Sequence, residues 1–144
     1  NNSFVFYTNL KSRKSYELNI NKNVAAVFWW PQIGKQVRIE GYVKIINKKE
    51  ADYYFSTRTR ESQIGAWASN QSSKLKNRKT LIKRFKIIEK RFENKDVPRP
   101  SFWSGYEIKP FLIEFWQGRE NRLHDRIVYK KINQKKWKKY RLNP

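Results

Sequence analysis

The fold is decided by the stretch QVRIEGYVKII, residues 36–46. Its apolar and small residues recur at every second position from Val37 to Ile45, which is the spacing of a β-strand with one buried face. A second β-favouring run covers residues 24–30 and is ended by Pro31, and Gly34 stands in the turn between the two runs. These features predict an antiparallel hairpin.

The rest of the chain continues in the order strands, helices, strands. Ser12 is the expected N-cap of the first helix. Further strands are predicted at residues 4–8, 102–108, 111–116, 126–132 and 137–142, and helices at residues 12–21, 48–57, 61–68 and 81–94. This order, with short connections, predicts an α+β fold with an antiparallel sheet or barrel and a single domain over residues 1–144.

The composition is that of a folded protein without thiol chemistry. Aromatic residues make up 16% of the chain, whereas disordered chains are poor in aromatics. There is no cysteine and one histidine, so we expect no disulfide, no cysteine nucleophile and no metal site. No apolar run approaches the roughly 20 residues of a membrane span, and we expect a cytoplasmic protein without a membrane partner. Methionine is absent, so we expect Asn1 not to be the native start of the chain.

The formal net charge of +21 raises the possibility of a nucleic-acid-binding protein. The lysines are, however, spread from Lys11 to Lys139 and mixed with many Asn and Ile residues. We therefore interpret most of the charge as solvated surface, and a nucleic-acid partner is a weaker alternative.

One segment, residues 116–126, concentrates groups that bind anions. If it is an extended strand, Arg122, His124 and Arg126 lie on one face and Leu123 and Asp125 on the other. Two guanidiniums and an imidazole on one face suit a phosphate or a phosphorylated ring, because arginine offers a rigid fork of donors. The alternative is the solvated face of an edge strand.

Two other clusters suit phosphates as well. Tyr7 and Thr8 end a strand shortly before Arg13 and Lys14 begin a helix, and helix N-terminal amides favour anions. The alternative is a capped surface helix. Tyr54, Arg58 and Ser62 lie four residues apart, which is one helical face if the helix continues; the alternative is an exposed face with one buried ring.

Four segments of the sequence resemble a known family. The segments that carry the resemblance are FYTNL with SRK (residues 6–14), RESQIGAW with QSS (residues 60–73), VP with PSFW (residues 97–103), and EFWQG with RLHDR (residues 114–126). They resemble, in order, the flavin-phosphate segment, the central signature and the C-terminal signature of the pyridoxamine 5′-phosphate oxidases.

The resemblance implies an FMN-binding split barrel with flanking helices and a homodimer with FMN sites at the subunit interface. By position, the residues implied to contact FMN are Tyr7, Thr8, Arg13, Lys14, Gln36, Gln71, Ser72, Trp116 and Arg126. The residues implied to bind substrate are Tyr54, Arg58, Ser62, Arg122, Leu123 and His124, of which Arg122 and His124 are the catalytic candidates.

The implied reaction is oxidation of pyridoxamine or pyridoxine 5′-phosphate to pyridoxal 5′-phosphate, in which dioxygen is reduced to hydrogen peroxide. The family also has an upstream strand whose Arg and Lys reach the two phosphates, and we expect it to precede Asn1. Besides a nucleic-acid binder, a split barrel that holds flavin or pyridoxal 5′-phosphate without turnover stays open as an alternative.

Overall fold

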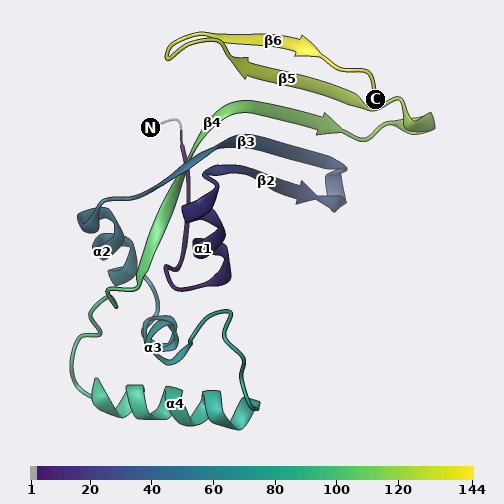
Figure 1. Ribbon diagram of the computed structural model, residues 1–144. Coiled ribbons are helices and arrows are strands. Elements are labelled where there is room, and N and C mark those ends of the chain that lie inside the picture. Colours follow the sequence, from purple (N-terminus) through teal and green to yellow (C-terminus); the bar gives the residue numbers. More distant parts are fainter. Residues whose placement is uncertain (1–2) are drawn as a thin grey trace. The chain divides into compact units, whose positions relative to one another are not determined.

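The computed structural model describes residues 3–144, which form two compact units. One unit, called the sheet unit below, contains residues 3–4, 21–44 and 108–144. The other, called the helical unit, contains residues 5–20 and 45–107. Figure 1 labels the helices and strands of both units.

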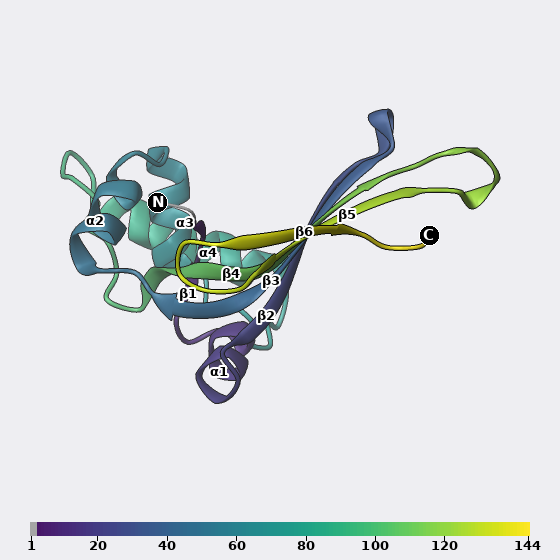
Figure 2. The ribbon, with the colours of Figure 1, turned by 90° about the horizontal axis from the view of Figure 1, so that it is seen from above.

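The sheet unit is built from antiparallel hairpins. Its strands are β2 (Asn23–Trp30), β3 (Lys35–Ile45), β4 (Trp103–Gln117), β5 (Asp125–Lys131) and β6 (Trp137–Arg141), which lie side by side in that order. The first residues of β4, up to residue 107, belong to the helical unit. The register pairs Phe28 with Val37 in the β2–β3 hairpin and Glu114 with Val128 in the β4–β5 hairpin. Figure 2 shows these two hairpins extending to the same end of the unit.

The predicted alternation in β3 is confirmed over its central part. Ile39, Gly41 and Val43 are buried, whereas Tyr42 and Lys44 are exposed. A Cβ on Gly41 would come within 2.5 Å of the Lys109 carbonyl oxygen, so this position requires glycine for a close approach of β3 to β4. Gly34 ends the short 3₁₀ turn Pro31–Ile33 with φ of 56°, which completes the predicted hairpin connection.

The prediction of two strands at residues 102–108 and 111–116 is wrong, because the structure has one continuous strand, β4. Pro110 lies inside it and is buried. Proline cannot donate to a strand ladder, and the β4–β5 pairing begins only at Leu112, two residues further on. A proline at this position therefore does not interrupt the β4–β5 ladder.

The helical unit contains α1 (Arg13–Ile20), α2 (Lys48–Ser56), α3 (Arg60–Ala68) and α4 (Arg78–Arg91), together with β1 (Phe4–Asn9), which pairs with β4. The predicted cap at Ser12 is confirmed, and the other helix starts are capped as well: Ser12, Asn47, Thr59 and Asn77 each accept a backbone N–H of the following turn. The core is formed by Phe55, Ile64, Phe92, Val97 and Trp103. Its rings and aliphatic side chains hold α2, α3 and α4 against the start of β4.

Candidate functional site

The helical unit contains a cavity of about 660 Å³ between β1, α2, α3 and the first residue of β4. Its walls include several of the residues that the sequence predicted for a site, namely Tyr7, Thr8, Tyr54, Arg58, Ser62 and Gln71. The other lining residues are Val5, Phe6, Asn9, Gly65, Ala66, Ser69 and Trp103. None of these side chains is acidic, so the described walls of the cavity carry the positive charge of Arg58 alone.

Arg58 lies in the break between two helices. Tyr54, Arg58 and Ser62 would share one helical face only if the helix continued, and the two separate helices that the sequence predicted are confirmed: α2 ends at Ser56 and α3 begins at Arg60. The Thr59 hydroxyl caps α3 by accepting the Ser62 N–H at 3.3 Å and donates to the Ser62 hydroxyl at 3.0 Å. The three predicted residues line the same cavity even though a turn separates them.

Three parallel rings form one wall of the cavity. Tyr7 lies face to face with Tyr54, with ring centroids 3.6 Å apart and an interplanar angle of 4°. Trp103 continues the block, at 5.3 Å from Tyr7 and 6.3 Å from Tyr54, with interplanar angles of 10° and 6°. Burial raises the pKa of the Tyr7 phenol, which therefore stays protonated and able to donate.

The Arg58 guanidinium is held by rings and by no carboxylate. It lies 4.9 Å from the Trp103 ring centroid and 5.8 Å from that of Phe55. Its Nη1 is buried and has no hydrogen-bond partner within residues 3–144. Burial lowers the pKa of Arg58 from its ordinary value, and a desolvated guanidinium with a free donor gains most from an anion that enters the cavity.

Gln71 connects the end of β1 to the loop after α3. Its side-chain oxygen accepts both the Thr8 hydroxyl and the Asn9 N–H, each at 3.0 Å. These two bonds fix the amide plane and leave its NH₂ group without a protein acceptor within the described chain. Ser72 follows with φ of 70°, in the left-handed region, and is exposed.

Arg13 and Lys14 lie in the helical unit but do not line the cavity. The Arg13 guanidinium is exposed and bonds Glu17 at 2.7 Å, four residues along α1, which raises its pKa. The Lys14 ammonium lies 5.4 Å from the Phe6 ring centroid. The buried groups of this segment are Ser12 and Ser15, whose hydroxyls bond each other at 3.2 Å and fix the start of α1.

The remaining predicted residues lie in the sheet unit. Gln36 and Trp116 line a hollow of about 560 Å³ at the tips of the β2–β3 and β4–β5 hairpins. The tips are joined by the Gly118 N–H, which donates to the Gly34 carbonyl at 2.8 Å. The Trp116 ring lies 4.7 Å from the imidazole of His124 and 5.8 Å from the ring of Trp29.

The expectation that residues 116–126 form one extended strand face is wrong. β4 ends at Gln117, a 3₁₀ turn covers Glu120–Arg122, and β5 starts at Asp125. Asn121 and Arg122 have φ of 54° and 61°, so the backbone coils here instead of alternating. Arg122 and Leu123 are exposed on this turn, whereas His124 is half-buried.

The turn is held by its own polar groups. The Arg119 N–H donates to Nδ1 of His124 at 3.1 Å, which leaves the proton of the neutral imidazole on Nε2. Asp125 accepts Arg119 and Arg141, each at 2.9 Å, and these bonds lower its pKa. His124 therefore presents an Nε2–H donor from a braced loop.

Arg126 is engaged with a buried carboxylate. Its Nε and Nη2 donate to Glu114 at 2.7 and 3.1 Å, across the β4–β5 pair, and Arg38 from β3 donates to the same carboxylate at 3.1 Å. The Glu114 side chain is 4% exposed. Hydrogen bonds from Arg126 and then from Arg38 hold its pKa below the ordinary value.

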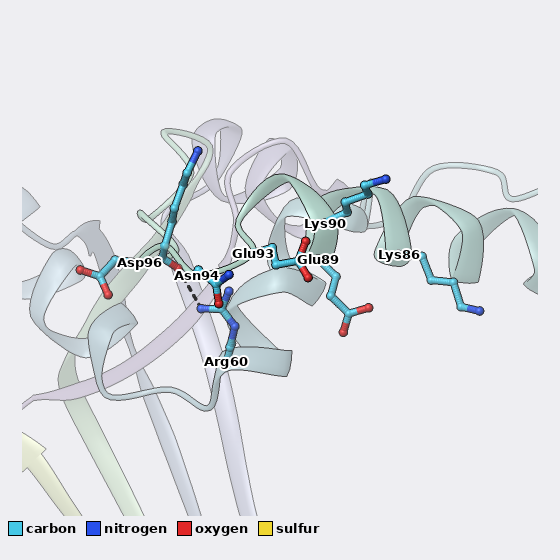
Figure 3. A pocket seen from close by; sticks show the side chains of 8 residues that line it. Arg60, Lys86, Glu89, Lys90, Glu93, Asn94 and Asp96 are labelled. Carbon is cyan, nitrogen blue, oxygen red and sulfur yellow. Dashed lines mark hydrogen bonds between the residues drawn. The ribbon is translucent and has the colours of Figure 1, made fainter.

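A larger hollow of about 960 Å³ lies elsewhere in the helical unit, between Arg60 and the end of α4 (Figure 3). Its rim mixes lysines with Glu89, Glu93 and Asp96. The Arg60 guanidinium donates hydrogen bonds to two backbone carbonyls, that of Lys95 at 2.9 Å and that of Phe92 at 2.5 Å. With opposite charges interspersed and its arginine satisfied, this hollow is a weaker anion site than the cavity around Arg58.

Within residues 3–144, no group of three or more His, Cys, Asp or Glu side chains is placed to hold a metal ion. Over the same residues, no helix has the length and apolar character needed to cross a membrane.

Trp103 is the site residue that the sequence reasoning missed. Its aromatic character is visible in the sequence, but its neighbours Tyr7, Tyr54 and Arg58 are 45 or more positions away, and no local pattern links them. Only the packing of β1, α2 and β4 in the helical unit brings the four side chains to one cavity.

Comparison with known proteins gives two family matches. Residues 1–92 match the model described as pyridoxamine 5′-phosphate oxidase. Residues 103–144 match the model described as the pyridoxine 5′-phosphate oxidase C-terminal dimerisation region.

Two curated relatives, both named pyridoxine/pyridoxamine 5′-phosphate oxidase, are similar over nearly the whole chain. The protein of Vesicomyosocius okutanii is 52% identical over 141 residues, which cover 98% of this chain and 66% of the relative. That of Rubrobacter xylanophilus is 50% identical over 141 residues, which cover 98% of this chain and 64% of the relative. The chain thus spans slightly less than two thirds of the length of these relatives.

Solved structures agree on the fold. PhzG from Burkholderia lata 383, in complex with tetrahydrophenazine-1-carboxylic acid, superimposes with a TM-score of 0.88 at 28% identity, covering 97% of this chain and 68% of that one. A pyridoxamine 5′-phosphate oxidase-related, FMN-binding protein from Nostoc punctiforme gives a TM-score of 0.75 at 13% identity, covering 99% of this chain and 74% of that one, and shows the fold alone. The predicted α+β split barrel with flanking helices is confirmed. The chain belongs to the pyridoxamine 5′-phosphate oxidase family.

Proposed function

We propose that this chain oxidises pyridoxamine or pyridoxine 5′-phosphate to pyridoxal 5′-phosphate with FMN as cofactor and dioxygen as electron acceptor. The curated relatives carry the name of this activity. The observation that supports it most directly is the buried, unpartnered Nη1 of Arg58 in a cavity whose described walls contain no carboxylate. Such a group favours a dianion such as a phosphate ester.

The substrate phosphate is assigned to Arg58, Tyr54 and Ser62. The guanidinium supplies charge and paired N–H donors, and the Ser62 hydroxyl, half-buried at the start of α3, lies on the same wall. The first turn of α3 adds the positive end of a helix dipole. Fixing the phosphate at this point orients the attached ring, and such positioning is a large part of catalysis by enzymes that use a redox cofactor.

The residues around Gln71 fit a polar cofactor. Its side-chain oxygen is already bonded by Thr8 and Asn9, so its NH₂ group is directed to donate elsewhere. The protonated Tyr7 phenol adds a second donor on the same cavity. We assign FMN to these groups, and the resemblance to the family assigns the same cofactor to Arg13, Lys14, Ser72, Gln36, Trp116 and Arg126. When bound, FMN would supply the two-electron oxidation of the substrate and the reduction of dioxygen to hydrogen peroxide.

Arg122 and His124 are assigned to the substrate ring. Arg122 is exposed on the hairpin turn, so its side chain is accessible to a ligand. The Nε2–H of His124 is a donor whose orientation is fixed by the Arg119 N–H and by the Trp116 ring. This donor would hold a polar substituent of the substrate ring.

We also propose a homodimer with FMN sites at the subunit interface. Residues 103–144 match a dimerisation region. In addition, the edge strand β2 exposes Val27, Phe28, Trp29 and Trp30 by 55, 42, 49 and 44%. A contiguous exposed apolar strand is a typical site of association.

The test is spectroscopic. The purified protein, saturated with FMN, should be bleached by pyridoxine 5′-phosphate without oxygen and should release hydrogen peroxide with oxygen. If the protein retains flavin but neither phosphorylated substrate bleaches it, the proposed oxidase activity is refuted. The alternative of a split barrel that binds flavin without turnover would then remain. A protein that binds no FMN, but whose DNA affinity falls steeply with salt, would favour the nucleic-acid alternative.

A further inference from the structure

Several arginines of the described chain are paired with carboxylates. Those with a carboxylate partner are Arg13, Arg38, Arg99, Arg119, Arg126 and Arg141. Arg58 differs, because its buried Nη1 has no hydrogen-bond partner within residues 3–144, and no carboxylate there pairs with its guanidinium. Its described contacts are the faces of Trp103 and Phe55.

An aromatic contact has a different consequence for an anion site from that of a carboxylate. A carboxylate fixes a guanidinium but occupies its N–H fork and neutralises its charge, so an incoming phosphate must compete with it. The face of an indole attracts the cation through its quadrupole and leaves the N–H groups at the edge of the guanidinium free. An arginine held in this way is oriented and still fully available.

Trp103 is itself fixed before any ligand arrives. The side chain is 6% exposed, and its ring packs edge-on against Phe55 at 5.1 Å and parallel to Tyr7 at 5.3 Å. Its backbone is held from both sides: its N–H donates to the Pro100 carbonyl at 3.0 Å, and its carbonyl accepts Arg99 at 2.5 Å. The Trp103 ring is therefore a fixed surface for the Arg58 guanidinium and lies nearer to it than the Phe55 ring does.

We infer that Trp103 is a positioning residue, which orients the Arg58 guanidinium for the substrate phosphate by a cation–π contact without neutralising it. The inference rests on the proposed function, because that function assigns Arg58 to the substrate phosphate. Trp103 touches no reacting atom in this scheme, so its loss should weaken phosphate binding and leave the chemical step intact.

The experiment places a fluorinated tryptophan at position 103 in the FMN-saturated protein. Fluorination withdraws electron density from the ring face and keeps its shape, so packing is retained while the cation–π attraction falls. The dissociation constant of pyridoxine 5′-phosphate should rise about threefold to tenfold. That of unphosphorylated pyridoxine should change by less than about twofold, and KM should rise while kcat is kept.

Matched variants isolate the contact. Fluorinated tryptophan at position 67 is the control, because Trp67 also carries an arginine over its ring, Arg91 at 5.4 Å, but does not line the cavity. It should leave the affinity for pyridoxine 5′-phosphate unchanged. In an Arg58→Gln background, fluorination at position 103 should have no further effect, because the cation is gone. Trp103→Phe keeps a ring and should bind more tightly than Trp103→Leu.

The outcomes separate this inference from the proposed function. Equal affinity of the wild type and the position-103 variant for pyridoxine 5′-phosphate overturns the inference alone. An equal loss for phosphorylated and unphosphorylated pyridoxine also overturns it, because the role is then general packing. If the wild type binds no pyridoxine 5′-phosphate, the proposed function fails; titration with inorganic phosphate then tests Trp103, and unchanged phosphate affinity in the variant overturns the inference.

Discussion

Glu114→Gln should destabilise the sheet unit substantially, because it removes the charge from a buried carboxylate that two arginines share. Glu114 is 4% exposed and accepts two bonds from Arg126 and one from Arg38. The glutamine side chain has the same shape, but its NH₂ group would face guanidinium donors. The change therefore acts on charge and hydrogen bonding and creates no cavity.

The magnitude follows from the partners. Removing one member of a buried charge pair typically costs about 3–5 kcal/mol. Here the Arg38 and Arg126 side chains are 35% and 30% exposed and can turn partly to water. We therefore expect a loss of about 2–3 kcal/mol in the free energy of unfolding, or about 6–9 °C in Tm.

The pH dependence of stability tests independently whether the charge of Glu114 stabilises the fold. The pKa of Glu114 is lowered in the folded protein. A carboxyl group with a lowered pKa stabilises the fold at pH values above its unfolded-state pKa of about 4.3. This stabilisation is lost as the pH falls through the pKa of the folded state. The difference between wild type and Glu114→Gln should thus be full at neutral pH and shrink in acid.

The assay is urea unfolding of both proteins at neutral and at acidic pH. Glu17→Gln is the control, because Glu17 also pairs with an arginine but is 56% exposed, and this change should cost less than about 0.5 kcal/mol. A Glu114→Gln protein within about 0.5 kcal/mol of wild type at neutral pH, or a difference that stays constant in acid, would refute the reasoning.

Three further predictions concern single positions. Arg122→Ala should lower turnover about 100-fold or more and leave FMN affinity nearly unchanged, as measured by flavin fluorescence; flavin loss at unchanged turnover would contradict its assignment to the substrate. Gln71→Ala should weaken FMN binding about tenfold, because it removes an amide that Thr8 and Asn9 orient; wild-type retention would exclude Gln71 from the cofactor site. Gly41→Ala should lower the free energy of unfolding in urea by about 1–3 kcal/mol, because its Cβ would meet the Lys109 carbonyl oxygen at 2.5 Å. A variant as stable as the wild type would show that β3 and β4 do not require this close approach.

Much of the secondary structure was predictable because its signals are local. The period-two burial of Ile39, Gly41 and Val43 and the caps at Ser12 and Thr59 depend on residues a few positions away. The extended reading of residues 116–126 failed for the same reason. Alternating side chains are compatible with a strand, but the bond between Gly118 and Gly34 and the left-handed backbone of Asn121 and Arg122 make a turn there.

The sequence by itself determined most of the strands and helices and the family, because capping, periodicity and motif order depend on neighbouring residues. Tertiary structure alone decided which side chains meet. It placed Trp103 under Arg58 and left that guanidinium without a carboxylate, whereas it gave Arg126 the buried carboxylate of Glu114. The two arginines look alike in the sequence; only long-range packing, which sets burial and partner, leaves one with an unpartnered N–H group and pairs the other with a carboxylate.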